Sequence, residues 1–265
     1  MNGTGNDFVI LDARKAPIAL TPEQVRRIAA RNNPATRGCD QLIVMEPARE
    51  AEAFMRIYNA DGSEVAACGN ATRCVAWRLM QESGRDQAVI RTLAGRLPAT
   101  RAGEAMVRVD MDTPNLGWQS VARVPAYKLG RLLAFTGLGE PFLVSMGNPH
   151  AVFFVSDVQA VDLARLGPMI EQNPVFPERV NVSIAQVRDA AHIDLRVWER
   201  GAGLTLACGT AACAALVAAA ATGLSSREAE IALPGGTLRV EWDEKTGHVF
   251  MTGAVQMEFE GELRL

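Results

Sequence analysis

Apolar residues in this chain occur in short runs separated by turn residues, a pattern typical of β-strands. The runs predict strands at residues 8–11, 42–45, 54–58, 89–92, 107–111, 152–155, 193–198, 238–242 and 249–251. A short helix is predicted after Thr21, whose hydroxyl can cap a helix that has Pro22 in its first turn. A turn is predicted over residues 59–62, Asn-Ala-Asp-Gly, so the first part of the chain is expected to be rich in sheet.

Two longer helices interrupt the strands. The first is predicted from Cys68 to about Glu82 and is ended by residues 83–84, and the second runs from near Cys208 to Gly223. The second helix is apolar on every side and mostly alanine, so we expect it to be buried in the middle of its half of the chain. The strands and helices together predict an α+β fold in which each half is a curved sheet around a central helix.

The chain contains an internal repeat. Segments that begin at residues 5, 56, 67 and 92 recur at residues 147, 196, 207 and 233, in the same order and at offsets of 140–142. The clearest pair is Ala67-Cys68-Gly69-Asn70-Ala71 and Ala207-Cys208-Gly209-Thr210-Ala211. Four repeated segments in the same order indicate two halves with the same fold, joined near residues 113–117. A length of 265 residues also suits two domains.

Composition excludes several classes of protein. A net charge of −3 and a pI near 5.7, with no basic cluster among aromatics, argue against a nucleic-acid partner. The longest apolar stretch, residues 211–221, is far shorter than the about 20 residues that span a membrane, and no secretory signal is present. Five cysteines without a dense framework suit reduced thiols, so we expect a cytoplasmic protein.

Cys68 and Cys208 each lie where a long helix begins, followed by Gly69 and Gly209. Unpaired N–H groups and the helix dipole at such a site can bind a carboxylate and lower a thiol pKa from about 8.5. Two matched thiols on either side of one carbon could remove a proton from one face and return it to the other. The repeat therefore predicts an acid/base pair that acts on the α-carbon of an amino acid.

Other interpretations of the cysteines are weaker. A buried cysteine often serves as a small apolar core residue, and we interpret Cys74 and Cys213 inside the helices in this way. Cys39 has no assigned chemistry. A zinc site is disfavoured because the cysteine spacings do not match those of zinc ligands. A Cys–His hydrolase using His150 stays open, although it would leave the second thiol without a role. A disulfide would require an oxidising compartment.

Organic cofactors are also disfavoured. Pyridoxal phosphate needs a lysine, and the only three, Lys15, Lys128 and Lys245, do not lie in a glycine- or serine-rich phosphate cradle. No P-loop and no strand–GxGxxG–helix unit occurs. We therefore expect side chains alone, with no cofactor and no metal, to carry the chemistry.

An ordered set of motifs resembles the diaminopimelate epimerases over essentially the whole chain. These motifs are Gly3-Thr4-Gly5-Asn6-Asp7-Phe8, Asn59-Ala60-Asp61-Gly62-Ser63-Glu64, Cys68-Gly69-Asn70, Gly147-Asn148-Pro149-His150, Glu199-Arg200-Gly201-Ala202-Gly203 and Ala207-Cys208-Gly209. The set separates the chain from the proline racemases and phenazine-pathway isomerases, which share the fold. The resemblance implies cofactor-independent epimerisation of LL-2,6-diaminopimelate to the meso isomer, in lysine and peptidoglycan precursor biosynthesis.

The resemblance also implies domain bounds and residue roles. Residues 1–114 would form the first half, with the C-terminal strand 254–265 returning to it, and residues 115–253 the second, with the active site in the cleft between them. Cys68 and Cys208 would be the acid/bases. Arg200 would pair with the distal carboxylate and Glu199 with an ammonium group. The other implied substrate-binding residues are Asn6, Gln41, Asn59, Gly69, Asn70, Asn148, Asn181, Gly209 and Thr210.

Two classes stay open at this point. The first is an epimerase with a small-molecule amino-acid substrate, for which a homodimer is left open. The second is a non-catalytic protein of the same fold that binds a ligand. The short segment before Gly3 could lead to this by loosening the cleft. His150 is placed near the site by the resemblance, but a structural role suits it equally.

Overall fold

The computed structural model describes residues 1–263 and divides into two compact units. Unit 1 consists of Met1–Asp110 and Thr252–Leu265, and unit 2 of Met111–Met251. Residues 264 and 265, the end of the C-terminal segment assigned above to the first half, lie outside the described residues. In the described part of that segment, Asn2 and Gln256 form an antiparallel bridge within unit 1.

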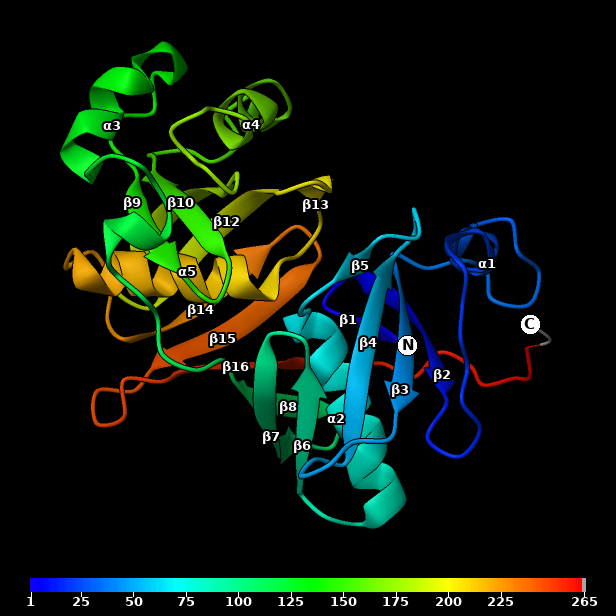
Figure 1. The fold of residues 1–265 in the computed structure, drawn as a ribbon. Coiled ribbons are helices and arrows are strands. Elements are labelled where there is room, and N and C mark those ends of the chain that lie inside the picture. Colours follow the sequence, from blue (N-terminus) through cyan, green and yellow to red (C-terminus); the bar gives the residue numbers. More distant parts are fainter. Residues whose placement is uncertain (264–265) are drawn as a thin grey trace. The chain divides into compact units, whose positions relative to one another are not determined.

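Unit 1 is built on a mixed sheet (Figure 1). Its strands are β1 (Asn2–Gly3), β2 (Asn6–Asp12), β3 (Gln41–Glu46), β4 (Ala53–Asn59), β5 (Glu64–Val65), β6 (Gln87–Thr92), β7 (Gly95–Gly103) and β8 (Met106–Asp110). They lie in the order β1-β2-β3-β4-β6-β7-β8, and β5 pairs with β4. The pairs β2–β3 and β4–β6 are parallel, whereas β1–β2, β3–β4, β6–β7 and β7–β8 are antiparallel.

Unit 2 repeats this plan. Its strands are β9 (Phe142–Ser145), β10 (Pro149–Phe154), β11 (Asn181–Asp189), β12 (His192–Glu199), β13 (Gly203–Thr205), β14 (Glu228–Leu233), β15 (Gly236–Trp242) and β16 (Val249–Ala254), whose last residues belong to unit 1. The order is β9-β10-β11-β12-β14-β15-β16, with β13 beside β12. The pairs β10–β11 and β12–β14 are parallel, like β2–β3 and β4–β6 in unit 1. The predicted α+β class with a twofold internal repeat is confirmed.

Five α-helices and two short 3₁₀ turns complete the described residues. The helices are α1 (Pro22–Ala29), α2 (Gly69–Ser83), α3 (Ala126–Leu132), α4 (Leu163–Glu171) and α5 (Gly209–Ala221), and the 3₁₀ turns are Trp118–Ser120 and Ala134–Thr136. Thr21 caps α1 as predicted, because its Oγ1 accepts from the Gln24 N–H at 3.2 Å. Gly84 ends α2 in the left-handed conformation, with φ of 69°.

The central helix of each unit lies against several strands of its own sheet. Helix α5 contacts β9 to β12, β14 and β15, and its apolar residues are buried on all sides, as predicted. Its alanines have no long side chains, so the sheet can close around the helix at short range. Helix α2 contacts β1, β2 and β6 to β8 and is buried through its first two turns. Burial of both helices fixes the direction in which their N-termini point within each unit.

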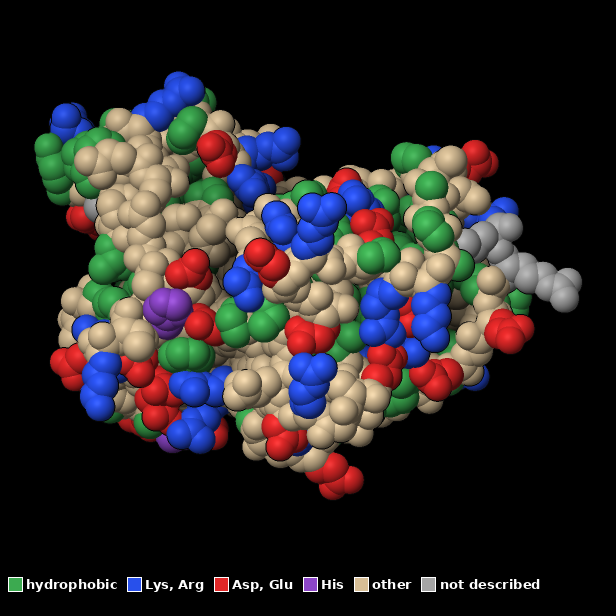
Figure 2. All heavy atoms as spheres, turned by 60° about the horizontal axis from the view of Figure 1, so that its bottom comes forward, with side chains coloured by type: hydrophobic (Ala, Val, Ile, Leu, Met, Phe, Trp, Pro, Cys, Tyr) green, Lys and Arg blue, Asp and Glu red, His purple; other side chains and the backbone are tan. Residues whose placement is uncertain are grey.

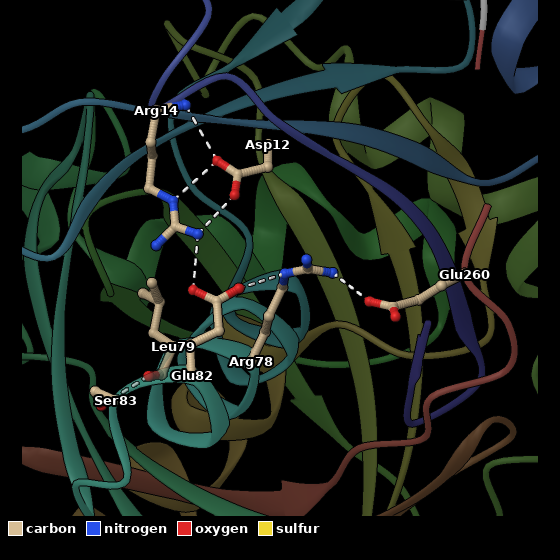
Figure 3. A network of polar contacts seen from close by, with 7 residues as sticks. All are labelled: Asp12, Arg14, Arg78, Leu79, Glu82, Ser83 and Glu260. Carbon is tan, nitrogen blue, oxygen red and sulfur yellow. Dashed lines mark hydrogen bonds and ion pairs between the residues drawn. The ribbon is translucent and has the colours of Figure 1, made fainter. Parts of the chain in front are cut away.

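The C-terminal part of α2 is also held by a network of charged side chains (Figure 3). Arg78 donates to Glu82 and to Glu260, both at 2.9 Å, and Arg14 donates to Glu82 at 2.7 Å. The Arg14 guanidinium also donates twice to Asp12, and the Arg14 backbone N–H donates once. These hydrogen bonds lower the pKa of that carboxyl to about 2. Partly exposed pairs each contribute little, about 0.2–1 kcal/mol. Together they link β2, α2 and the C-terminal segment.

The described surface carries charges of both signs. Figure 2 shows Lys and Arg side chains interspersed with Asp and Glu on the face that is drawn. Within residues 1–263, no helix combines the length and the apolar character needed to cross a bilayer.

Helix α4 packs closely against the end of β12 in unit 2. A Cβ atom at Gly167 would lie 2.4 Å from the Trp198 ring, so only glycine fits there. The Trp198 indole N–H donates to Glu171 Oε2 at 2.7 Å, and Glu171 Oε1 accepts from the Gly201 N–H at 2.9 Å. These contacts hold the end of β12 and the turn after it, where Glu199 and Arg200 lie.

We expect Gly167→Ala to destabilise unit 2 by about 1–3 kcal/mol, because the added methyl group must displace the Trp198 ring. The measurement is urea unfolding followed by tryptophan fluorescence. Gly130→Ala in α3 is the matched control, since its Cβ would meet Glu140 at an ordinary 3.5 Å. Equal stability of the two variants would contradict the tight packing of α4 on β12.

Candidate active site

The N-terminus of α2 begins at a cysteine. Cys68 is the N-cap residue, with an extended backbone of φ −148° and ψ 109°, and its Sγ accepts from the Ala71 N–H at 3.5 Å. The side chain is half-buried, whereas Gly69 and Asn70, the first residues of the helix, are buried. The first-turn N–H groups of a helix have no partner within it, so this end of α2 can bind an anion.

Two amide side chains of unit 1 lie together near this helix start. Asn70 Nδ2 donates to Asn6 Oδ1 at 2.6 Å. The fully buried Arg73 donates to Asn70 Oδ1 at 2.9 Å and to Thr4 Oγ1 at 2.7 Å. Sequence reasoning missed Arg73. The available signal was a charged residue five positions after Cys68 inside a helix that had to be buried.

Gln41 and Asn59 form a second pair in unit 1. They are partners in the register of β3 and β4, and Gln41 Nε2 donates to Asn59 Oδ1 at 3.0 Å. Asn59 Nδ2 donates in turn to Ser63 Oγ at 3.1 Å. The turn predicted at residues 59–62 is therefore present, and it fixes the Asn59 amide. All four neutral amides predicted for the first half thus occur in hydrogen-bonded pairs.

The N-terminus of α5 also begins at a cysteine, but its surroundings differ. Cys208 is an extended N-cap residue with φ −133° and ψ 114°, and it is only 6 % exposed. Burial, followed by the nearby Glu199 carboxylate, raises the pKa of the Cys208 thiol well above its usual value. The predicted lowering of the thiol pKa is therefore wrong for Cys208, because burial and a like charge outweigh the helix dipole.

A chain of hydrogen bonds runs from Cys208 to a buried histidine. Cys208 Sγ lies 3.5 Å from Thr210 Oγ1, which accepts from Asn148 Nδ2 at 3.2 Å. Asn148 Oδ1 lies 2.9 Å from His150 Nε2. Complete burial lowers the pKa of His150 to about 3, helped by the charge of Arg200, so the ring is neutral near pH 7. A neutral ring that carries its proton on Nε2 donates to Asn148 Oδ1 and so orients the Asn148 amide.

Glu199 and Arg200 lie at the end of β12. Glu199 Oε1 accepts from Thr205 Oγ1 at 2.5 Å, and burial raises the pKa of the Glu199 carboxyl. The Arg200 N–H donates to Asn181 Oδ1 at 2.9 Å, and its Nη1 donates to the Glu178 carbonyl at 2.8 Å. The Arg200 guanidinium stays about a third exposed, which leaves it able to bind an anionic ligand.

The Asn181 side chain links two segments of unit 2. Its Nδ2 donates to the Pro149 carbonyl at 3.0 Å, and its Oδ1 accepts from the Arg200 backbone. It thereby joins the start of β10 to the turn after β12. Gly209 and Thr210 begin α5, and Gly209 is buried like Gly69 in the other unit.

The remaining cysteines are buried. Burial raises the pKa of Cys39 to about 11 and that of Cys74 to about 12, so both are thiols at neutral pH. Cys74 and Cys213 lie inside α2 and α5 with no exposed surface, as predicted for core residues. Among residues 1–263, no three His, Cys, Asp or Glu side chains are grouped so that they could hold a metal ion.

Comparison with known proteins identifies close relatives. A family model described as diaminopimelate epimerase matches residues 1–117 and 142–258. A diaminopimelate epimerase of Phenylobacterium zucineum is 54 % identical over 99 % of this chain and 96 % of its own length. One from Acidiphilium cryptum is 52 % identical over 99 % of this chain and 94 % of its own length.

Solved structures share the fold at low sequence identity. A phenazine biosynthesis PhzF-family protein of Enterococcus faecalis matches with a TM-score of 0.67 at 18 % identity, covering 98 % of this chain and 94 % of that one. A hydroxyproline epimerase of Agrobacterium vitis matches with a TM-score of 0.64 at 16 % identity, covering 96 % and 86 %. At these identities the likeness shows the fold alone.

We expect Glu199→Gln to speed the alkylation of Cys208 at pH 7–8 about tenfold, because removing the carboxylate charge lowers the thiol pKa and one pKa unit is a tenfold change in thiolate. The measurement is the rate of iodoacetamide labelling of the Cys208 peptide by mass spectrometry. Glu178→Gln, at an exposed carboxylate near Arg200, is the control. A rate that does not rise in Glu199→Gln would show that the carboxylate does not act on this thiol.

Proposed function

This chain belongs to the diaminopimelate epimerase family, and we propose that it interconverts the LL and meso isomers of 2,6-diaminopimelate through Cys68 and Cys208, without a cofactor. The observation that carries the proposal is the cysteine N-cap at the start of a buried central helix in each unit. The same chemical group in the same structural place, once in each half of a repeat, suits a reaction that treats two faces of one carbon alike.

In this mechanism one sulfur begins as a thiolate and the other as a thiol. The thiolate removes the α-proton, so that a C–H bond breaks and an S–H bond forms. The thiol then gives its proton to the opposite face, so that an S–H bond breaks and a C–H bond forms with inverted configuration. The reverse reaction exchanges the roles, and no net proton is gained or lost.

Negative charge moves onto the α-carboxylate when the proton leaves. The first-turn N–H groups of α2 and α5, at Gly69, Asn70, Gly209 and Thr210, are the donors that suit this charge. Loss of a single preorganised donor of this kind typically costs about 3 kcal/mol of transition-state stabilisation. The N-termini of α2 and α5 thus provide the donors for the carboxylate and also position the two cysteine thiols.

The surroundings of Cys208 support different starting roles for the two thiols. The raised pKa of Cys208 keeps it a thiol at neutral pH, because it is buried beside Glu199. Cys208 is then the acid that first donates its proton, and Cys68 takes the part of the base. The opposite substrate isomer requires the proton to be on Cys68 instead.

Substrate recognition is assigned to polar groups near the two helix starts. Arg200 would bind the distal carboxylate, since its guanidinium is partly exposed and donates in a planar fork. Glu199 would accept from an ammonium group, and pairing with that cation would lower its raised pKa. The neutral amides assigned to orient the amino acid are Asn6, Gln41, Asn59, Asn148 and Asn181.

From the same family membership we propose the pathway, the compartment and the assembly of the protein. The product would serve the synthesis of lysine and of peptidoglycan precursors in the cytoplasm, and a homodimer is the proposed assembly. Five cysteines without a disulfide framework in the sequence support a reducing compartment.

We expect the parent chain to incorporate deuterium from D₂O at the α-carbon of LL- and meso-diaminopimelate, whereas proline does not exchange. Cys68→Ala and Cys208→Ala each lower epimerisation at least about 10³-fold, because each removes a group that makes or breaks a bond in the transition state. The measurement is ¹H NMR of the substrate together with chiral chromatography.

The controls are Cys74→Ala and Cys213→Ala, which remove buried thiols from the same two helices. Near-normal turnover in either catalytic variant would overturn the two-base scheme. Absence of exchange with both isomers in the parent chain would instead indicate a ligand-binding member of the fold.

A further inference from the structure

Arg73 is the largest fully buried side chain of unit 1, and the mechanism above gives it no task. Burying a guanidinium is costly unless its donors are paired, so its presence near Cys68 requires a reason. We propose that Arg73 is a positioning residue, which fixes the direction of the Asn70–Asn6 hydrogen bond and so presents the Asn6 N–H groups to the substrate carboxylate. The proposal rests on the proposed function.

The direction follows from the chemistry of the three side chains. A guanidinium can only donate, so the Asn70 oxygen must face Arg73, as it does at 2.9 Å. Asn70 therefore turns its Nδ2 toward Asn6 and donates to Asn6 Oδ1 at 2.6 Å. With its oxygen used in this way, Asn6 has its Nδ2 left to donate to a ligand. Arg73 thus determines, through two amides, which end of Asn6 a substrate meets.

Unit 2 carries different side chains at the equivalent positions, and there Asn148 Oδ1 is engaged by His150 Nε2 at 2.9 Å. Position 213, which is 140 residues after Arg73, is a cysteine. The equivalent hydrogen bond there runs in the opposite sense, because Asn148 Nδ2 donates to Thr210 Oγ1. The strand order, by contrast, is the same in both units. The direction of the bond is therefore set by the side chains present and not by the fold.

Arg73 also holds the turn that carries Asn6. Its Nη2 donates to Thr4 Oγ1 at 2.7 Å, across 69 residues of sequence. Thr4 has a φ of 54°, a left-handed conformation that is uncommon for threonine. Beside it, a Cβ atom at Gly3 would lie 3.0 Å from the Asn70 carbonyl, so the turn packs directly on the start of α2. One buried cation thus orders both partners of the Asn6–Asn70 pair.

The test is a double-mutant cycle between Arg73→Met and Asn6→Ala, read as KM and kcat for diaminopimelate. We expect Arg73→Met to raise KM about tenfold in the parent chain and less than about twofold when Asn6 is already alanine, because coupled residues are not additive. Arg73→Lys keeps a donor-only cation and recovers part of the affinity. Equal effects of Arg73→Met in both backgrounds would overturn the proposal.

Arg78→Met is the matched control, since Arg78 lies on the same helix in half-exposed ion pairs with Glu82 and Glu260, and we expect its KM to equal that of the parent.

A second variant covers the case in which Arg73→Met does not fold. Asn70→Asp keeps a strong partner for Arg73 but offers Asn6 only acceptors, so Asn6 must turn its oxygen toward the ligand. We expect a higher KM without a lower melting temperature; an unchanged KM would contradict the proposal.

Side-chain amide exchange in the ligand-free protein separates this proposal from the proposed function. We expect the Asn70 Nδ2 protons to exchange slowly in the parent chain and at least about tenfold faster in Arg73→Met, because the amide is then free to turn. If the parent chain does not epimerise diaminopimelate but shows this difference, the function fails and the positioning role stands. Unchanged exchange in Arg73→Met would reject the positioning role whatever the activity.

Discussion

The start of a buried helix is the constraint on which the rest of each unit depends. Helices α2 and α5 are enclosed by their own sheets, so the N–H groups of their first turns cannot be moved or hidden without disrupting the core. A cysteine at each N-cap places sulfur directly beside these donors. The sheet thus holds a thiol beside the first-turn N–H groups of the helix, and the proposed acid/base chemistry depends on where the helices begin.

The two halves keep the fold and vary the charges. Unit 1 places a buried cation, Arg73, behind the first helix turn, whereas unit 2 has a carboxylate, Glu199, close to its thiol. In the proposed mechanism, these unequal surroundings keep the proton on Cys208 and leave Cys68 as the base. The repeat places the two thiols alike, and the differences between its copies distinguish them.

Much of the fold could be predicted from the sequence, because its strands and central helices carry strong local signals. The alanine-rich run of α5 and the Thr21–Pro22 start of α1 are examples. Strands β7, β9, β11 and β14 were missed. The residues of β7 are mostly polar and include Pro98, and only pairing with β6 and β8 makes it a strand. The cysteines were found from the repeat, whereas the roles of Arg73 and His150 depend on partners distant in sequence.

The most direct test of the account is a crystal structure of the chain with diaminopimelate bound. Near-attack geometry requires reacting atoms about 3–3.5 Å apart. The account predicts that the sulfur atoms of Cys68 and Cys208 approach one α-carbon from opposite faces at about this separation, with the α-carboxylate at the N-termini of α2 and α5. A complex in which only one of the two sulfur atoms reaches the stereocentre would contradict it.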